Sequence, residues 1–220
     1  MNRLTVPVRV WDAPVRLFHW GIVALFGLSW LSESRGWMQV HFASGYALLA
    51  ALLFRIAWGF AGSESARFAR FLRHPVAGLR QLSRLHHREP DTEVTHNAAG
   101  GWMVLLILLL LAIQIATGLS ANDDISVEGP LAKYVGKETS DWLTHVHWVN
   151  FQIIEAVVLL HLLMLAAYAI VKRHDLVRPM ITGTKHLPPA IRAPRMVGAR
   201  RALALLALAG AIVVYIAVWV

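Results

Sequence analysis

The run MVLLILLLLAI, residues 103–113, carries no charged side chain, and the charge-free stretch around it extends over residues 98–119. A helix needs about 20 apolar residues to cross the ~30 Å hydrocarbon layer of a bilayer. In lipid, a helix satisfies its own backbone hydrogen bonds, whereas an open strand does not. The stretch therefore predicts a transmembrane helix.

Four further apolar stretches satisfy the same length criterion. They cover about residues 15–31, 41–61, 142–171 and 202–220. The composition agrees, because 57% of the residues are hydrophobic and only 15% are charged, against about 25% in soluble domains. The sequence predicts an all-α integral membrane protein: a four-helix bundle and a fifth, C-terminal transmembrane helix whose role is open.

The basic residues are distributed unevenly among the loops. If the helices alternate in direction, 17 of the 21 Lys and Arg residues fall on the side of the N-terminus and only three on the other side. Because cytoplasmic loops carry the excess of Lys and Arg, the N-terminus is expected in the cytoplasm and the C-terminus in the periplasm. The surplus of basic residues thus reflects topology and anionic lipid, and nucleic-acid binding is not expected. Residues 67–88, rich in Arg and His, predict an interfacial amphipathic helix.

Histidines lie within the predicted spans, where ionisable side chains are costly and usually functional. His147 and His161 are 14 residues apart, which places them within about 40° of each other on one helix face and roughly 21 Å apart along the axis. His19 lies early in the first span, on the cytoplasmic half, and His41 begins the second span, on the outer half. Matching depths predict the pairs His19 with His161 and His41 with His147.

Two stacked histidine pairs inside a helix bundle are typical of two b-type haems, each with two axial imidazole ligands. The chain has no cysteine, which excludes thiolate ligands and covalent haem attachment through Cys. Zinc or di-iron sites favour carboxylates beside the histidines, and Glu155 is the only acid within these four spans. The alternative is that each histidine simply bonds to the backbone or to a neighbouring helix.

Other polar and small residues fit a haem site, each with a second interpretation. Arg55 and Arg16 are placed to pair with haem propionates, or to extend to the cytoplasmic interface. Gly45, like Gly27, leaves room for a flat macrocycle, or serves helix packing. His96, at the cytoplasmic mouth of the third span, is a candidate for quinone or propionate contact.

Several motifs resemble the bacterial cytochrome b561 and nickel–iron hydrogenase b-type cytochrome family over roughly residues 8–186. The opening motif VWDAPVRLFHW, residues 10–20, is the most specific. The further motifs are HFASGY at 41–46, RIAWG at 55–59, HN at 96–97, GWM at 101–103, His147 with His161, and LVRPMITG at 176–183.

This resemblance implies a diheme cytochrome b domain over residues 1–186 in the bacterial inner membrane, followed by a linker and helix over 187–220. It implies haem ligation by His19, His41, His147 and His161. It also implies electron exchange between a membrane quinone, ubiquinone or menaquinone, and a partner such as a c-type cytochrome or a dehydrogenase subunit. The expected role is an electron-transfer subunit with no catalytic residue of its own. Two alternatives stay open: a stand-alone quinone-coupled oxidoreductase such as a superoxide oxidase, and a non-redox transporter that uses buried histidines.

Overall fold

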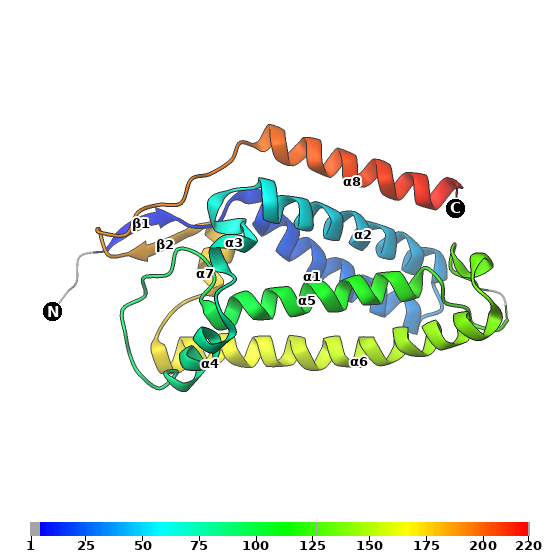
Figure 1. Cartoon of the computed structure of the whole chain (residues 1–220), viewed down its shortest axis with the longest axis horizontal. Helices are drawn as coiled ribbons and strands as arrows, with labels where there is room; N and C mark the ends of the chain where they lie inside the picture. Colours follow the sequence, from blue (N-terminus) through cyan, green and yellow to red (C-terminus); the bar gives the residue numbers. More distant parts are fainter. Residues whose placement is uncertain (1–4, 126, 220) are drawn as a thin grey trace. The chain divides into compact units, whose positions relative to one another are not determined.

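A computed structural model describes residues 5–125 and 127–219 of the chain. Within these residues, five helices are long and apolar enough to cross a membrane (Figure 1). They are α1 (Ala13–Ser34), α2 (Met38–Ala61), α5 (Ala98–Gly118), α6 (Lys137–Ala167) and α8 (Ala199–Trp219). The predicted all-α membrane bundle with a fifth helix is confirmed. Arg3 and Val220, which entered the charge count and the fifth predicted segment, lie outside the described residues.

The helix ends differ from the predicted ends by a few residues, for local reasons. Helix α1 begins before the expected residue because the Asp12 carboxylate accepts a hydrogen bond from the Val15 amide at 2.8 Å, as an N-cap does. Helix α6 continues as the π-helical turn η3 (Tyr168–Lys172) and ends where Arg173 adopts the left-handed conformation, with φ of 58°.

Short elements connect the long helices. The arginine-rich region, expected as one interfacial helix, contains two short helices, α3 (Phe68–Phe71) and α4 (Pro75–Ser83), separated where Leu72 becomes extended. The remaining elements are η1 (Glu64–Ala66), η2 (Ala132–Tyr134), α7 (Val177–Thr182), β1 (Val6–Arg9) and β2 (Thr184–Leu187).

The chain forms two compact units, and each of the five long helices contributes residues to both. The first unit comprises the described residues up to Leu17, Ile56–Leu106 and Val158–Ala202. In it, β1 and β2 pair as an antiparallel ribbon from Val6↔Leu187 to Arg9↔Thr184 (Figure 1). The indole of Trp58, fully buried, donates to the buried Asp12 carboxylate at 3.0 Å.

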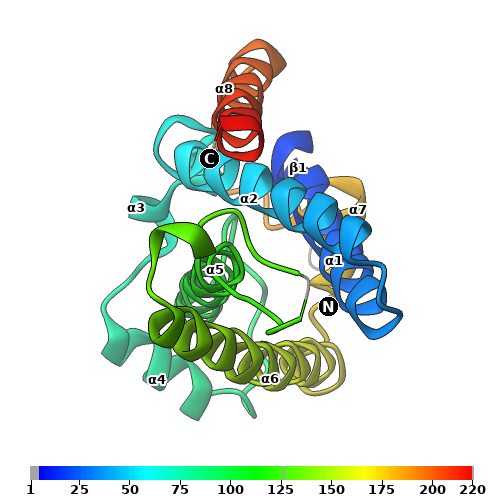
Figure 2. The same ribbon diagram turned by 90° about the vertical axis from the view of Figure 1, so that its right-hand side faces the viewer.

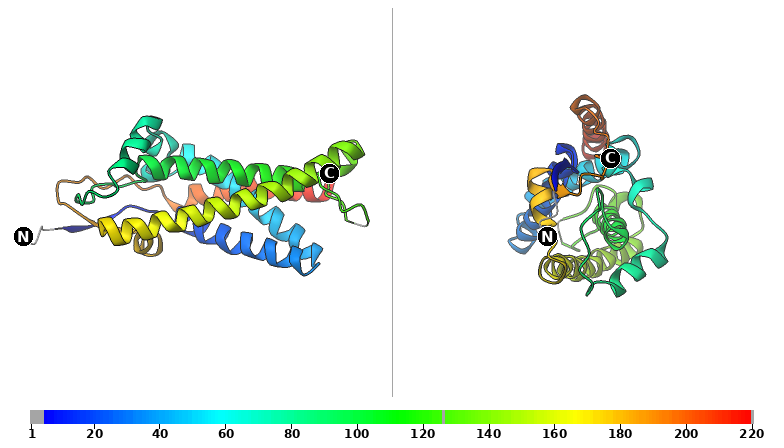
Figure 3. Two further views of the ribbon diagram at one scale, coloured as in Figure 1. Left: turned by 90° about the horizontal axis from the view of Figure 1, so that it is seen from below. Right: turned by 90° about the vertical axis from the view of Figure 1, so that its left-hand side faces the viewer.

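The second unit comprises Phe18–Arg55, the described part of Ile107–Val157, and the helix from Leu203 onward. Seen end-on, its segments of α1, α2, α5 and α6 surround a common centre, with α8 beside α2 (Figure 2). Helices α5 and α6 run side by side (Figure 3). The hydroxyls of Ser29 and Ser44 join α1 to α2 at 2.9 Å, and the Phe26 and Phe151 rings stack at 5.6 Å between α1 and α6.

Large apolar side chains cover the outside of the long helices. Leu109 on α5 is 56% exposed and Leu163 on α6 is 58% exposed, and many other Leu, Ile and Val residues on these helices are similarly uncovered. A water-soluble protein rarely exposes contiguous apolar area on this scale. These faces are suited to lipid, as the hydropathy pattern predicts.

Candidate functional site

His41 and His147 meet inside the second unit. His41 lies in the first turn of α2, and His147 lies in the third turn of α6. Their ring centroids are 6.4 Å apart and the ring planes are inclined by 78°. Both side chains are half-buried. The fold therefore brings together the two histidines that the sequence assigns to the outer half of the bundle.

A backbone carbonyl fixes each of the two rings through its Nδ1 atom. His41 Nδ1 lies 2.9 Å from the Ser29 carbonyl oxygen, and His147 Nδ1 lies 2.8 Å from the Gln114 carbonyl oxygen. A carbonyl only accepts, so each Nδ1 carries the proton and the lone pair resides on Nε2. This arrangement is usual for metal-ligating histidines, because it sets both the tautomer and the ring orientation.

The side-chain amides of Gln114 and Asn150 form a chain of hydrogen bonds that ends at Nε2 of His147. The Gln114 side-chain Nε2 donates to His147 Nε2 at 3.1 Å. The buried Asn150 amide donates to Gln114 Oε1 at 2.7 Å and to the Leu110 carbonyl at 3.0 Å, which orients the Gln114 side chain. Iron ligation by His147 Nε2 therefore requires the Gln114 amide to swing away from that nitrogen.

Glycines on the helices of this unit differ in what they leave room for. A Cβ at Gly118, the last residue of α5, would lie 2.7 Å from Cε1 of His147, so only glycine allows the ring to sit against that helix end. A Cβ at Gly45 or at Gly27 would meet no atom within 4 Å. The first glycine thus seats the imidazole, whereas the other two lie where the helices are not packed against one another.

The residues around His41 and His147 fit a haem. An imidazole nitrogen lies about 2.0–2.1 Å from a bound first-row metal such as zinc. With about 1.1 Å from that nitrogen to the ring centre, two rings on one metal have centroids about 6.2–6.4 Å apart. The 6.4 Å separation matches this distance, and the two Nδ1 bonds leave Nε2 of each ring as the metal-binding nitrogen once the Gln114 amide has moved from His147.

His19 and His161 belong to different units, and their pairing stays a prediction. His19 is half-buried on α1, with its ring edge-on to Trp20 at a centroid distance of 5.0 Å. His161 is half-buried on α6.

Arg16, Arg55 and His96 are the other polar residues that the sequence assigns to the site. Arg16 donates through Nη1 to the Ile181 carbonyl, while its buried Nε has no hydrogen-bond partner among the described residues. Arg55 is 3% exposed on α2, in the second unit. His96 packs between two aromatic rings of the first unit, Trp11 at 4.7 Å and Phe71 at 5.0 Å. These positions are compatible with the expected contacts and do not test them.

Four residues that position the pair were not assigned that role from the sequence. Ser29 and Gln114 hold the Nδ1 atoms through their backbone carbonyls, which every residue type offers, so no sequence signal marks that role, although the Gln114 amide is itself a polar group within a membrane span. Gly118 has, in the sequence, only the signature of a glycine that ends a helix, which does not indicate a contact with histidine. Asn150 had a usable signal, because it lies three residues after His147 on the same helix face, and a polar amide within a membrane span usually has a specific partner.

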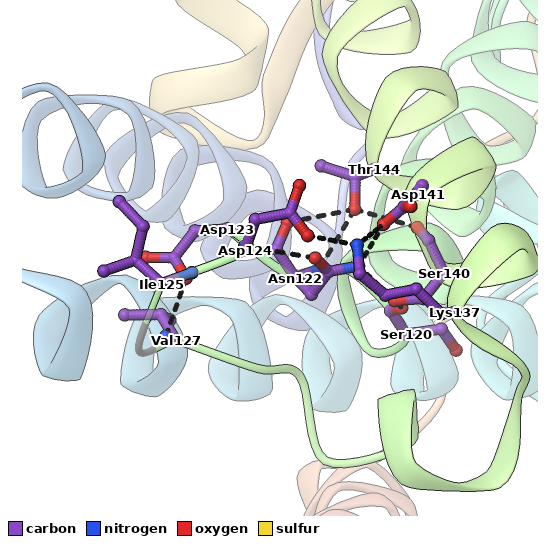
Figure 4. A network of polar contacts seen from close by, with 10 residues as sticks. All are labelled: Ser120, Asn122, Asp123, Asp124, Ile125, Val127, Lys137, Ser140, Asp141 and Thr144. Atoms are coloured by element: carbon purple, nitrogen blue, oxygen red, sulfur yellow. Dashed lines mark hydrogen bonds and ion pairs between the residues drawn. The ribbon is translucent and has the colours of Figure 1, made fainter.

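The connection between α5 and α6 is held by a polar network within the second unit (Figure 4). Lys137 pairs with Asp124 and Asp141, and the Asn122 amide bonds to Ser140 at 2.6 Å. The Asp123 carboxylate accepts from the backbone amides of Ile125 and Val127. The described residues of this loop, called the acidic loop for Asp123, Asp124 and Glu128, are therefore tied to the start of α6 by side-chain contacts.

Comparison with known proteins identifies one family. The family model described as prokaryotic cytochrome b561 matches residues 10–183, which is most of the chain and ends before the linker to α8. No curated protein and no solved structure matches the chain.

Proposed function

Because the chain belongs to the prokaryotic cytochrome b561 family, and is thus a membrane b-type cytochrome of electron transfer, we propose that it holds two haems b between paired histidines and passes electrons between a membrane quinone and a protein partner. The observation that carries this proposal is the His41–His147 pair, with a 6.4 Å centroid separation and both Nδ1 atoms bonded to backbone carbonyls.

His41 and His147 would hold the outer haem, and His19 with His161 the cytoplasmic one. The second assignment rests on the helical spacing between His147 and His161 and on the range of the family match, residues 10–183, which includes all four positions. When bound, haem supplies a one-electron iron couple. The ligands fix the iron, and the carbonyls of Ser29 and Gln114 raise the basicity of their imidazoles by accepting the Nδ1 protons.

Arg16 and Arg55 supply the cations for propionates of the cytoplasmic haem. Arg16 supports this role through its Nε, which is buried without a hydrogen-bond partner in the described chain, because such a donor favours a carboxylate. Arg55 is a buried guanidinium 14 residues after His41 in the same helix. His96, between Trp11 and Phe71, is the proposed contact for a quinone head group.

The acidic loop between α5 and α6 is the proposed docking surface for a basic redox partner, such as a c-type cytochrome. Lys137 is neutralised by Asp124 and Asp141, and the Lys133 ammonium lies over the Tyr134 ring at 5.0 Å. The remaining charge on this loop is negative, which steers a cationic partner and repels a small anion. This favours an electron-transfer subunit over an oxidase of superoxide.

The positive-inside rule supports an N-terminus in the cytoplasm and a periplasmic C-terminus. The loops of the first unit would then face the cytoplasm and the acidic loop the periplasm. Residues 1–186 form the proposed diheme domain, and residues 187–220 a linker and anchoring helix. Reporter fusions that fluoresce only in the cytoplasm test the orientation: a fusion after α4 should fluoresce, and one after α8 should not.

Haem counting in histidine variants tests the central proposal. The dithionite-reduced wild-type protein should show a b-type alpha band and two haems per chain. His41→Ala and His147→Ala should each leave one haem, and the double variant should also leave one, because both ligands serve the same iron. His19→Ala and His161→Ala should each remove the other haem. The haem that these variants retain should have a different midpoint potential from the haem that His41→Ala and His147→Ala retain.

His145→Ala is the matched control, because His145 is exposed on the same helix two residues from His147 and stacks on Trp148. It should retain both haems. Two haems in the purified His147→Ala protein, or loss of both in the His41→Ala/His147→Ala protein but one in each single variant, would contradict the shared-iron assignment.

A further inference from the structure

A pocket of about 400 Å³ with several charged residues in its lining lies in the first unit, outside the histidine pair and outside the surfaces discussed above. The segment between η3 and α7, helix α7, strands β1 and β2 and the loop before α5 contribute its walls. The pocket includes Arg173, which directly follows Lys172, the last residue of the fourth membrane span. It is therefore located at the level where a membrane helix leaves the bilayer.

The floor of the pocket is a group of largely buried charged and polar side chains. The Lys185 ammonium contacts the Asp91 carboxylate at 2.6 Å and the Glu93 carbonyl at 3.1 Å. His174 Nε2 lies 2.8 Å from the Glu89 carbonyl. The side chains of Lys185, Asp91 and His174 are only 11%, 16% and 15% exposed. The floor is thus fixed, and Lys185 has three N–H donors for only two acceptors.

The rim of the pocket carries the cations without partners. Arg173 and Arg178 line the pocket, are exposed, and have no side-chain hydrogen bond or ion pair within the part of the chain that the structure describes. The acids nearby are engaged: Asp91 by Lys185, and Asp175 by the backbone amides of Val177 and Arg178. The spare charge at the rim is therefore positive, and guanidinium groups match phosphate in shape and charge.

Exposed apolar side chains flank this cationic rim. Ile170 is 74% exposed on the last turn of the fourth span, and Ile181 is 58% exposed on α7. A free phosphate ion makes no favourable contact with apolar side chains, whereas a phospholipid carries acyl chains next to its phosphate. The pocket volume also exceeds what a bare phosphate ion fills.

We propose that this pocket binds the headgroup of an anionic phospholipid, with Arg173 and Arg178 on the phosphate and the acyl chains along Ile170 and Ile181. The proposal requires only that the chain sits in a membrane and is independent of the haem assignments. Bound lipid joins the end of the fourth span, α7 and β2, so it secures the loops that lead into α8.

A binding titration tests the proposal on the full-length protein with haem bound, in a zwitterionic detergent. The probe is a fluorescent phosphatidylglycerol, with unlabelled phosphatidylglycerol, phosphatidylcholine and inorganic phosphate as competitors. Arg173→Gln/Arg178→Gln should weaken phosphatidylglycerol binding by about 30-fold, as expected for two basic residues near an anionic surface. The control Arg84→Gln/Arg200→Gln removes the same charge from exposed positions outside the pocket and should bind as the wild type does.

The three competitors distinguish an anionic lipid from a zwitterionic lipid and from free phosphate as the occupant of the pocket. Competition by phosphatidylglycerol alone supports an anionic lipid site. Equal competition by phosphatidylcholine shows that the pocket does not select charge, and displacement of the probe by millimolar inorganic phosphate assigns it to free phosphate; either result overturns the proposal. So does wild-type affinity in the Arg173→Gln/Arg178→Gln protein, whose folding is checked by its haem spectrum and thermal unfolding.

Discussion

Replacing Gly118 with alanine tests whether His147 is seated by the end of α5. The added Cβ would lie 2.7 Å from Cε1 and 3.1 Å from Nδ1 of the imidazole. Ordinary carbon contacts begin near 3.4 Å, so the ring must move by about 0.7 Å. A shift of that size stretches the 2.8 Å bond from His147 Nδ1 to the Gln114 carbonyl to about 3.5 Å, beyond hydrogen-bond range.

The expected cost follows from the loss of this bond. Removing a group that orients a metal-bound histidine typically lowers metal affinity by about 10- to 100-fold. Gly118→Ala should therefore lose its outer haem about 10 to 100 times faster to an excess of a haem-scavenging globin, while the second haem leaves at the wild-type rate. A redox titration should show a changed midpoint potential for one haem only.

Gly210→Ala is the control for the substitution itself. Gly210 is in the interior of α8, where a Cβ would meet no atom within 4 Å, so Gly210→Ala makes the same glycine-to-alanine change in a helix without a steric contact. It should lose haem at the wild-type rate. If Gly118→Ala also behaves as the wild type in haem loss and in midpoint potential, then His147 does not depend on this contact, and the proposed ligand geometry is wrong.

Two further predictions concern the first unit. Asp12→Ala removes the N-cap of α1 and the carboxylate that accepts from the buried Trp58 indole, so the free energy of unfolding should fall by about 2 to 4 kcal/mol in denaturant titrations. Trp58→Phe should destabilise the Asp12→Ala protein less than it destabilises the wild type, because the two residues share one hydrogen bond. The hydrogen bond from the backbone amide of Arg195, together with nearby arginines, lowers the pKa of Glu64 below its ordinary value near 4.5. The stabilisation from the ionised carboxylate is complete above the ordinary pKa and is lost as the pH falls through the lowered pKa. Pepsin should therefore cleave the linker over residues 188–198 faster toward lower pH in the wild type, and the rate of cleavage in Glu64→Gln should rise less with the same fall in pH.

The spans of the bundle were predictable from the sequence because they rest on a strong physical signal. Hydrocarbon excludes unsatisfied backbone and charge, so runs such as residues 103–113 have one stable structure, and all five predicted spans are helices. The β1–β2 ribbon was not predictable. Its strands are about 175 residues apart in the chain, each has only four residues, and neither shows the alternation of apolar and polar residues that marks a longer strand.

The same contrast holds at the candidate site. Helical periodicity placed His147 and His161 on one face, because the repeat of 3.6 residues is a property of every helix. The partners of the Nδ1 atoms were out of reach, since the Ser29 and Gln114 carbonyls are chosen by the distance between helices and not by residue type. That distance depends on small contacts, such as the Ser29–Ser44 hydroxyl bond between α1 and α2.

These backbone contacts imply how the site tolerates sequence change. A carbonyl stays in place when its own side chain is replaced, so substitution of the Ser29 hydroxyl or of the Gln114 amide leaves an acceptor for each Nδ1. The ring positions instead depend on residues that set how closely the helices approach, Gly118 and the buried Asn150 above all. Substitutions at these spacing residues should disturb haem binding more than substitutions at the two residues whose carbonyls hold the rings, although neither spacing residue reaches the iron.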